Sequence, residues 1–153
     1  MRKLIIEKDV EEKILSIQIT YSFKKEIGGI LVGIYDAEFR GMRITDISYP
    51  FAGDQQLRFH FFRKRDGHQE LMDQLWEKSN HTKAYLGEWH THDQRIPVPS
   101  RTDHDTWKRI SKSNNNFDEC YFMIIGRTEF IIWAVSGSGI AEVYRGNSNG
   151  KKH

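Results

Sequence analysis

The sequence predicts a single α+β domain, α/β-like in that helices and strands are mixed along the chain. Its 153 residues suit one compact domain and leave little room for a second. Segments with apolar residues every three or four positions are interspersed with short apolar runs typical of strands. The final part holds strand-like runs separated by glycine-containing turns, so an antiparallel meander is expected to close the domain.

The N-terminal half alternates between patterns typical of helices and of strands. Val10, Ile14 and Ile17 recur at helical spacing and predict the buried face of a helix, for which Asp9 is the expected N-cap. The elements expected in this half are a strand at 2–7, a helix at 9–22, strands at 30–35, 41–49 and 57–62, and a helix at 68–79.

The C-terminal half is expected to contain a central strand, one helix and the closing meander. The elements expected there are a strand at 83–92, a helix that opens at Ser100, and strands at 119–126, 128–135 and 140–145. Residues 146–153 are polar and are expected to form a flexible tail, so the domain itself is expected to span residues 1–145.

Composition and charge indicate a cytoplasmic protein. No stretch approaches the roughly 20 apolar residues needed to span a bilayer, and acidic residues follow the first apolar run too closely for a signal peptide. The net charge of +2 is too small to favour nucleic acid as a partner, and no membrane partner is expected. The one cysteine, Cys120, lies in an apolar run and is expected in the core, so any metal would be bound by His, Asp or Glu.

The segment EWHTHDQRIPVPSRTD, residues 88–103, carries the strongest chemical signal. His90 and His92 are two apart, so on a strand both imidazoles project from one face and can reach one cation. Asp103, one turn into the following helix, can approach the end of that strand. Two histidines and one carboxylate form the three-ligand set expected of a hydrolytic zinc site.

Taken singly, each of these residues has a simpler explanation. A His pair on a strand often binds no metal, and Ser100 and Asp103 form an S-x-x-D pattern that resembles a helix capping box. Glu26 lies in a charged FKKE stretch, where a solvated side chain is the default expectation.

Taken together, the residues resemble the JAMM signature of the JAB/MPN metalloenzymes. The pattern is E-x-G-G-x-L-x-G from Glu26 to Gly33, then H-x-H, seven residues and S-x-x-D from His90 to Asp103. The resemblance spans nearly the whole chain. It implies a single JAB/MPN domain that resembles a cytidine-deaminase-like sandwich, with a mixed, curved sheet flanked by about three helices.

The resemblance also implies a role for each motif residue. His90, His92 and Asp103 would bind Zn²⁺, Glu26 would activate the zinc-bound water, and Ser100 would donate a hydrogen bond to the oxyanion. The neighbours His104 and Asp105 lack the family spacing. Many members of the family have proline directly after the second histidine, whereas this chain has Asp93.

The local form G-E-W-H-T-H…P-x-P-S-x-x-D-x-x-x-W, from Gly87 to Trp107, is similar to minimal prokaryotic members, most of all the deconjugating isopeptidases of CBASS antiphage operons. This implies a deubiquitinase-like protease in antiviral defence. Its substrate would be a cGAS/DncV-like nucleotidyltransferase or ubiquitin-like protein joined by its C-terminus to a target. Enzymes resembling ubiquitin-activating and ubiquitin-conjugating proteins would be pathway partners. The substrate's extended C-terminal tail is expected to add as a strand at an exposed sheet edge.

Two other function classes stay open at this point. One is a metal-dependent hydrolase of a small amide, such as an adduct of a sulfur-carrier protein. The other is a metal-stabilised binding module without turnover, against which the presence of Glu26 argues, since zinc binding alone does not need it. A two-His, one-carboxylate set also suits Fe²⁺ or Mn²⁺, as in non-haem iron oxygenases, but those enzymes do not need partners such as Glu26 and Ser100.

Overall fold

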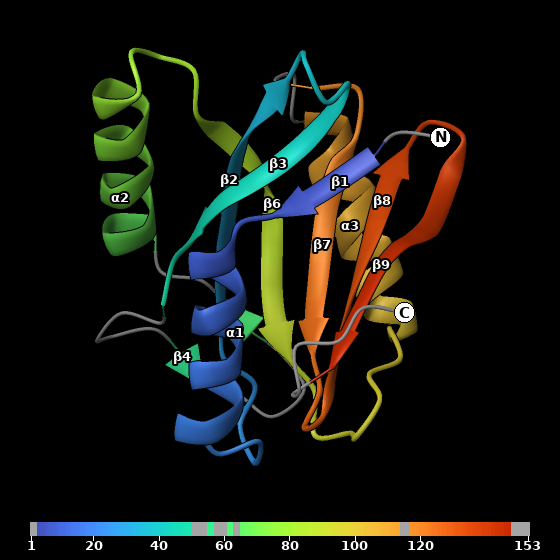
Figure 1. Ribbon diagram of the computed structural model, residues 1–153. Coiled ribbons are helices and arrows are strands. Elements are labelled where there is room, and N and C mark those ends of the chain that lie inside the picture. The colour runs from blue at the N-terminus through green and yellow to red at the C-terminus, as the bar shows by residue number, and fades with distance from the viewer. Residues whose placement is uncertain (1–2, 50–54, 57–60, 63–64, 114–116, 148–153) are drawn as a thin grey trace.

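A computed structural model describes residues 3–49, 55–56, 61–62, 65–113 and 117–147 of the chain (Figure 1). Its elements are β1 (Lys3–Ile6), α1 (Lys8–Thr20), β2 (Gly28–Asp36), β3 (Gly41–Ile47), β4 (Gln55–Gln56), β5 (Phe61–Phe62), α2 (Arg65–Lys78), β6 (Ala84–Thr91), α3 (Arg101–Ser113), β7 (Cys120–Ile125), β8 (Glu129–Ser136) and β9 (Gly139–Asn147). The predicted α+β class is confirmed.

The start of α1 differs from the sequence-based expectation. Glu7, and not Asp9, is the N-cap residue, and it makes no side-chain capping bond. The Glu7 N–H donates to the Ile44 carbonyl at 3.1 Å and continues the pairing of β1 with β3, while the Glu7 carbonyl accepts the N–H groups of Val10 and Glu11. The helix therefore begins directly where the strand pairing ends. Asp9 lies in its first turn, where a negative charge stabilises the helix by interacting with the helix dipole.

Two other expectations concern segments that are only partly described. Of the strand expected at 57–62, Phe61–Phe62 forms β5 and the remaining residues lie outside the described part of the chain. Strand β9 runs through Gly146 and Asn147, which pair with Phe130 and Glu129, so it extends two residues into the expected tail. Residues 148–153 lie outside the described part.

Seven strands form one mixed sheet in the order β1-β3-β2-β6-β7-β8-β9. The pairs β1/β3 and β6/β7 are parallel and the other pairs are antiparallel, so the closing meander β7-β8-β9 is confirmed. The edge strands β1 and β9 contact each other, and the sheet therefore curves into a nearly closed form (Figure 1). Strand β6 lies in the middle and is paired on both sides, by β2 and by β7.

The side chains of the sheet divide between two cores. Along β7, residues 121, 123 and 125 join one core, and residues 120, 122 and 124 join the other, as the two-residue period of a strand requires. The first core includes Val10, Ile14 and Ile17 of α1, which confirms the predicted buried helix face. Cys120 is buried in the second core, as expected.

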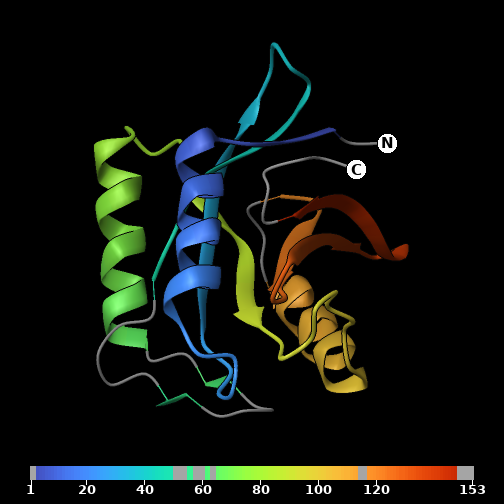
Figure 2. The ribbon, with the colours of Figure 1, turned by 60° about the horizontal axis from the view of Figure 1, so that its bottom comes forward.

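Helix α3 packs on the sheet through Trp107, which is only 3% exposed. Its indole stacks on Phe122 at a centroid distance of 5.1 Å and lies 5.4 Å from the Trp133 ring. Figure 2 shows α1 and α2 to the left of β6 and α3 to its right. Among the described residues, none of these helices combines the length and the apolar character that crossing a bilayer demands.

Candidate metal centre

The predicted site residues come from segments that meet at the C-terminal end of β6. His90 lies on β6, and His92 follows its last residue, Thr91. Glu26 lies in the loop before β2, and Ser100 directly precedes α3. Asp103 lies in the first turn of α3. The chain thus brings together the side chains of Glu26, His90, His92 and Asp103, and Ser100 is hydrogen-bonded to Asp103.

The alternation of β6 decides which way the histidines face. Trp89 and Thr91 are 0% and 2% exposed and point into the protein, and the Trp89 indole N–H donates to the Ser48 carbonyl at 2.8 Å. His90 and His92 therefore share the opposite side, as the spacing predicted. Their ring centroids lie 4.9 Å apart.

Glu26 reaches this point because its neighbour Ile27 is bound to Thr91 twice. The Ile27 N–H donates to Thr91 Oγ1 at 3.1 Å, and the Ile27 carbonyl accepts the Thr91 N–H at 2.9 Å. Gly28 pairs with His90, and a Cβ at Gly28 would overlap the Trp89 carbonyl oxygen and lie 3.2 Å from the His90 Cα and Cβ. Glycine is therefore needed for this close approach, which places the Glu26 carboxylate beside the imidazoles.

Asp103 is held by a reciprocal cap with Ser100. The Asp103 N–H donates to Ser100 Oγ at 3.1 Å, and the Ser100 N–H donates to Asp103 Oδ2 at 2.7 Å. The capping-box explanation of these two residues is thus correct. It does not exclude chemistry, because the cap uses a lone pair of the Ser100 hydroxyl and leaves its proton for another acceptor.

Four side chains converge within a few ångströms. His90 Nε2 lies 3.2 Å from His92 Nε2 and 3.2 Å from Asp103 Oδ1. His92 Nε2 lies 3.3 Å from Asp103 Oδ2 and 3.3 Å from Glu26 Oε1. The side chains are only 10–15% exposed, so the polar atoms are largely shielded from water.

Hydrogen bonding alone cannot satisfy this convergence. His92 Nε2 faces His90 Nε2, Glu26 Oε1 and Asp103 Oδ2, yet one ring nitrogen offers only one in-plane proton or one lone pair. A cation among these atoms would interact with all of them. Two ligand atoms at about 2.0–2.1 Å from a tetrahedral Zn²⁺ lie roughly 3.3–3.4 Å apart, which matches the spacing of the histidine nitrogens from each other and from the Asp103 and Glu26 oxygens. The donor set therefore fits the predicted metal, and one ligand atom each of Glu26, His90 and His92 lies within 4.8 Å of the others.

The carboxylates shift the protonation of the site. Burial opposes a charge on His92, but the hydrogen bond and charge of Asp103, aided by Glu26, raise the pKa of His92 above its ordinary value. Burial likewise opposes ionisation of Asp103, but the hydrogen bonds from His90 and His92 hold its pKa well below its usual range. The site therefore carries ionised Asp103 and attracts positive charge.

The neighbours that lack the family spacing have other contacts. The His104 ring lies 5.9 Å from that of Trp107, and Asp105 is exposed on α3. Glu88, which shares the strand face of His90, accepts a hydrogen bond from the Tyr85 hydroxyl at 3.2 Å. None of these three side chains is among the four that converge.

Sequence reasoning missed Gln94, whose side-chain oxygen lies 3.2 Å from His92 Nδ1. Its only signal in the sequence was a polar residue two positions after the second histidine.

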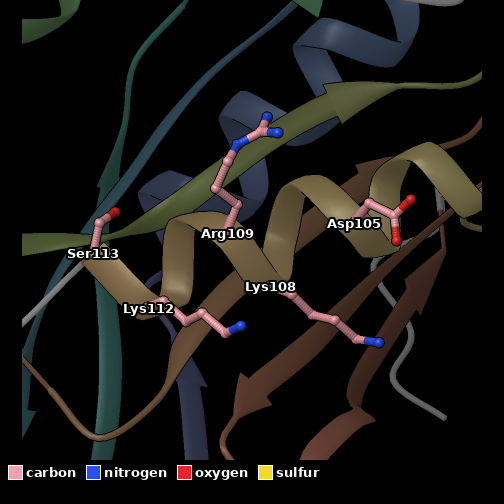
Figure 3. Close-up of a pocket in the computed structure, with 5 residues that line it drawn as sticks. All are labelled: Asp105, Lys108, Arg109, Lys112 and Ser113. Carbon is pink, nitrogen blue, oxygen red and sulfur yellow. The ribbon is translucent and has the colours of Figure 1, made fainter.

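A separate hollow of about 420 Å³ lies along α3, lined by Asp105, Lys108, Arg109, Lys112 and Ser113 (Figure 3). Figure 3 shows Lys108 and Lys112 extending from one side of the helix and Arg109 from another. The hollow includes none of the converging residues, and the site is therefore distinct from it.

Comparison with known proteins identifies relatives over most of the chain. A family model described as prokaryotic homologs of the JAB domain matches residues 9–136. A CD-NTase/cGAS isopeptidase of Vibrio cholerae is 34% identical over 129 residues, which are 83% of this chain and 78% of that protein. Proteins of the same name from Pseudomonas aeruginosa and Escherichia coli are 34% and 37% identical over 78% and 68% of this chain, and these matches cover 74% and 65% of those proteins.

Solved structures share the fold at low sequence identity. A protein from Desulfitobacterium hafniense superposes with a TM-score of 0.60 at 20% identity, over 91% of this chain and 88% of its own. A protein from Salinibacter ruber superposes with a TM-score of 0.58 at 15% identity, over 90% and 87%. These two likenesses concern the fold alone.

Proposed function

Because the chain belongs to the family of prokaryotic homologs of the JAB domain, we propose that it is a zinc-dependent isopeptidase. It would hydrolyse the amide bond that follows the C-terminus of a conjugated protein. The observation that carries the proposal is the convergence of His90, His92 and Asp103 at mutual distances of 3.2–3.3 Å, with the Glu26 carboxylate beside them.

In this proposal His90, His92 and Asp103 hold the metal. A zinc ion bound there would lower the pKa of a water molecule and polarise the scissile carbonyl group. Neutral imidazoles and an ionised carboxylate are the forms that bind a metal, and the low pKa of Asp103 keeps it ionised at neutral pH.

Glu26 and Ser100 supply the proton transfers and the oxyanion contact. Glu26 takes a proton from the attacking water and passes it to the leaving amine, for which its position 3.3 Å from His92 Nε2 is suited. Ser100, whose oxygen lone pair caps α3, can donate its hydroxyl proton to the carbonyl oxygen as negative charge develops there.

The names of the relatives suggest the substrate. We propose a CD-NTase/cGAS-like nucleotidyltransferase, or a ubiquitin-like protein, whose extended C-terminal tail is joined to a target. Enzymes resembling ubiquitin-activating and ubiquitin-conjugating proteins would form the conjugate, and the setting would be cytoplasmic antiviral defence. Since β6 is paired on both sides, a tail that adds as a strand would have to pair with backbone other than that of β6.

Zinc content and cleavage, measured on the same purified proteins, test this proposal. The substrate is a CD-NTase/cGAS-like protein with a folded reporter fused after its C-terminus. The reversed fusion, in which that C-terminus is free, serves as the substrate control. We expect wild type to hold one zinc ion per chain and to cut the first fusion at the junction. Glu26→Gln is expected to keep zinc and lose cleavage, because the amide cannot accept the proton.

Asp103→Asn and Asp105→Asn form a matched pair on α3. Asp103→Asn is expected to lose zinc, and Asp105→Asn, which alters an exposed carboxylate outside the site, is expected to behave as wild type. A wild-type protein without zinc would contradict the metal centre, and full activity of Glu26→Gln would contradict its role. Zinc without cleavage of the fusion would contradict the proposed substrate.

A further inference from the structure

The side-chain oxygen of Gln94 contacts two nitrogen atoms. The Val98 N–H lies 2.9 Å from Gln94 Oε1, and His92 Nδ1 lies 3.2 Å from the same atom. A backbone N–H can only donate, so the Gln94 atom that faces Val98 is the carbonyl oxygen and not the amide nitrogen. Because that oxygen can only accept, the contact with His92 requires a proton on Nδ1.

A proton on Nδ1 decides what the other ring nitrogen can do. A neutral imidazole protonated at Nδ1 carries its lone pair on Nε2. In His92 that atom faces His90 Nε2, Asp103 Oδ2 and Glu26 Oε1. We propose that Gln94 is a positioning residue that keeps the His92 ring in its metal-binding tautomer and orientation. The inference rests on the proposed function, because it assigns Gln94 a purpose in metal binding.

Backbone contacts hold Gln94 in place. The Gln94 N–H donates to the His92 carbonyl at 2.8 Å, and the Gln94 carbonyl accepts the Arg127 N–H at 2.7 Å. The Arg127 guanidinium also pairs with the Asp93 carboxylate at 2.5 Å. The segment that begins at Asp93 is thus tied to the turn between β7 and β8.

The hydrogen bond from the Val98 N–H holds the Gln94 side chain from the following part of the same loop. It joins residues four positions apart and so fixes the Gln94 side chain as well as its backbone. Gln94 is exposed, and the burial of a polar group therefore does not account for these contacts. An oxygen that is already held by one donor is well suited to orient a second one, the His92 ring.

Two substitutions distinguish the effect of the Gln94 oxygen from that of the rest of the side chain. Gln94→Met has nearly the same length but replaces the oxygen with a weakly accepting sulfur, whereas Gln94→Glu keeps an oxygen that can accept from both nitrogens. Gln18→Met is the matched control. The Gln18 amide nitrogen donates to the Gly126 carbonyl at 3.0 Å, so this control removes a hydrogen bond of the same region that does not involve a histidine ring.

The zinc dissociation constant, measured by competition with a chelator, is the first readout. We expect Gln94→Met to bind zinc about 10- to 100-fold more weakly, as is typical when the partner of a ligating histidine is lost. Gln18→Met is expected to bind zinc as tightly as wild type. Gln94→Glu is expected to bind zinc as tightly as wild type or more tightly. Zinc binding by Gln94→Met at wild-type strength would overturn the inference.

The second readout is the tautomer of His92 in the metal-free protein, from the ¹⁵N chemical shifts of its ring. At a pH above the raised pKa of His92, where its ring is neutral, we expect the proton on Nδ1 in wild type, Gln94→Glu and Gln18→Met, and a mixture of tautomers in Gln94→Met. An unchanged Nδ1 tautomer in Gln94→Met would refute the positioning role even if zinc binding weakened. This readout needs no metal. A wild-type protein that binds no zinc would contradict the proposed function, but the tautomer measurement would still test the contact between Gln94 and His92.

Discussion

Asp103 and Ser100 cap each other's backbone. The Ser100 N–H donates to Asp103 Oδ2 at 2.7 Å, and the Asp103 N–H donates to Ser100 Oγ at 3.1 Å. The same Asp103 oxygen lies 3.3 Å from His92 Nε2, so the helix cap and the metal centre share one carboxylate. Ser100 thus combines a structural role with the proposed chemical one, and substitutions can separate the two.

Ser100→Ala is expected to slow cleavage by about 10²–10³-fold, because the oxyanion loses a donor. It is also expected to lower the free energy of unfolding by about 1 kcal/mol, because α3 loses its cap. Ser100→Gly lacks the hydroxyl but caps almost as well, so it should be as slow as Ser100→Ala and more stable. Turnover and thermal unfolding of both variants check this. Wild-type turnover in Ser100→Ala would leave Ser100 with the capping role alone.

Thr91→Val is expected to slow cleavage while zinc is retained. The change removes the oxygen that accepts the Ile27 N–H, and Ile27 adjoins Glu26, whereas none of the three metal ligands is held by that bond. Leaving this buried N–H without its acceptor should cost about 1–3 kcal/mol of stability. Turnover, zinc content and unfolding of Thr91→Val and Thr91→Ser provide the measurement. Thr91→Ser keeps the hydroxyl and should stay close to wild type; equal turnover of all three proteins would refute the prediction.

Trp107→Ala is expected to destabilise the protein by about 3–5 kcal/mol, since it removes a buried indole between Phe122 and Trp133. Zinc binding should weaken as well, because the same helix carries Asp103. Trp76→Ala is the control, as Trp76 is 42% exposed on α2. Chemical denaturation with and without zinc compares the two variants. A loss below about 1 kcal/mol for Trp107→Ala would show that α3 does not depend on this anchor.

The stability of the protein should depend on Asp36 only above strongly acidic pH. Hydrogen bonds from Arg43, at 2.6 and 3.2 Å, and from the Phe39 N–H hold the pKa of Asp36 below its usual value. A carboxyl with a lowered folded-state pKa stabilises the fold above its unfolded pKa of about 3.9, and this contribution is lost as pH falls through the lower folded value.

Asp36→Asn should therefore unfold at a lower temperature than wild type at neutral pH, and the difference should close below about pH 4. Thermal unfolding between neutral pH and strongly acidic pH is the measurement. In an Arg43→Gln background the Asp36→Asn change should have a smaller effect, because the main partner is already absent. A difference between wild type and Asp36→Asn that stays constant with pH would contradict the assignment.

Much of the fold followed from local patterns. The faces of α1 and β6 were predictable because a helix and a strand repeat their side-chain directions with fixed periods. The N-cap of α1 was not, since Glu7 takes that position only because its N–H pairs with Ile44 of β3, a distant residue. Aspartate is a preferred residue at helix N-caps, but the pairing of β1 with β3 placed Glu7 at this position instead of Asp9.

By itself, the sequence determined which residues can form the site: His90 and His92 share a face because they are two apart on a strand, and Asp103 and Ser100 cap each other because they are three apart at a helix start. Only the tertiary structure decided that Glu26 lies 3.3 Å from His92 and that Gln94 accepts from its ring. The first relationships are local and follow from backbone periodicity. The others depend on the pairing of β2 with β6 and on the loop tied to Arg127, which bring together residues that no periodicity relates.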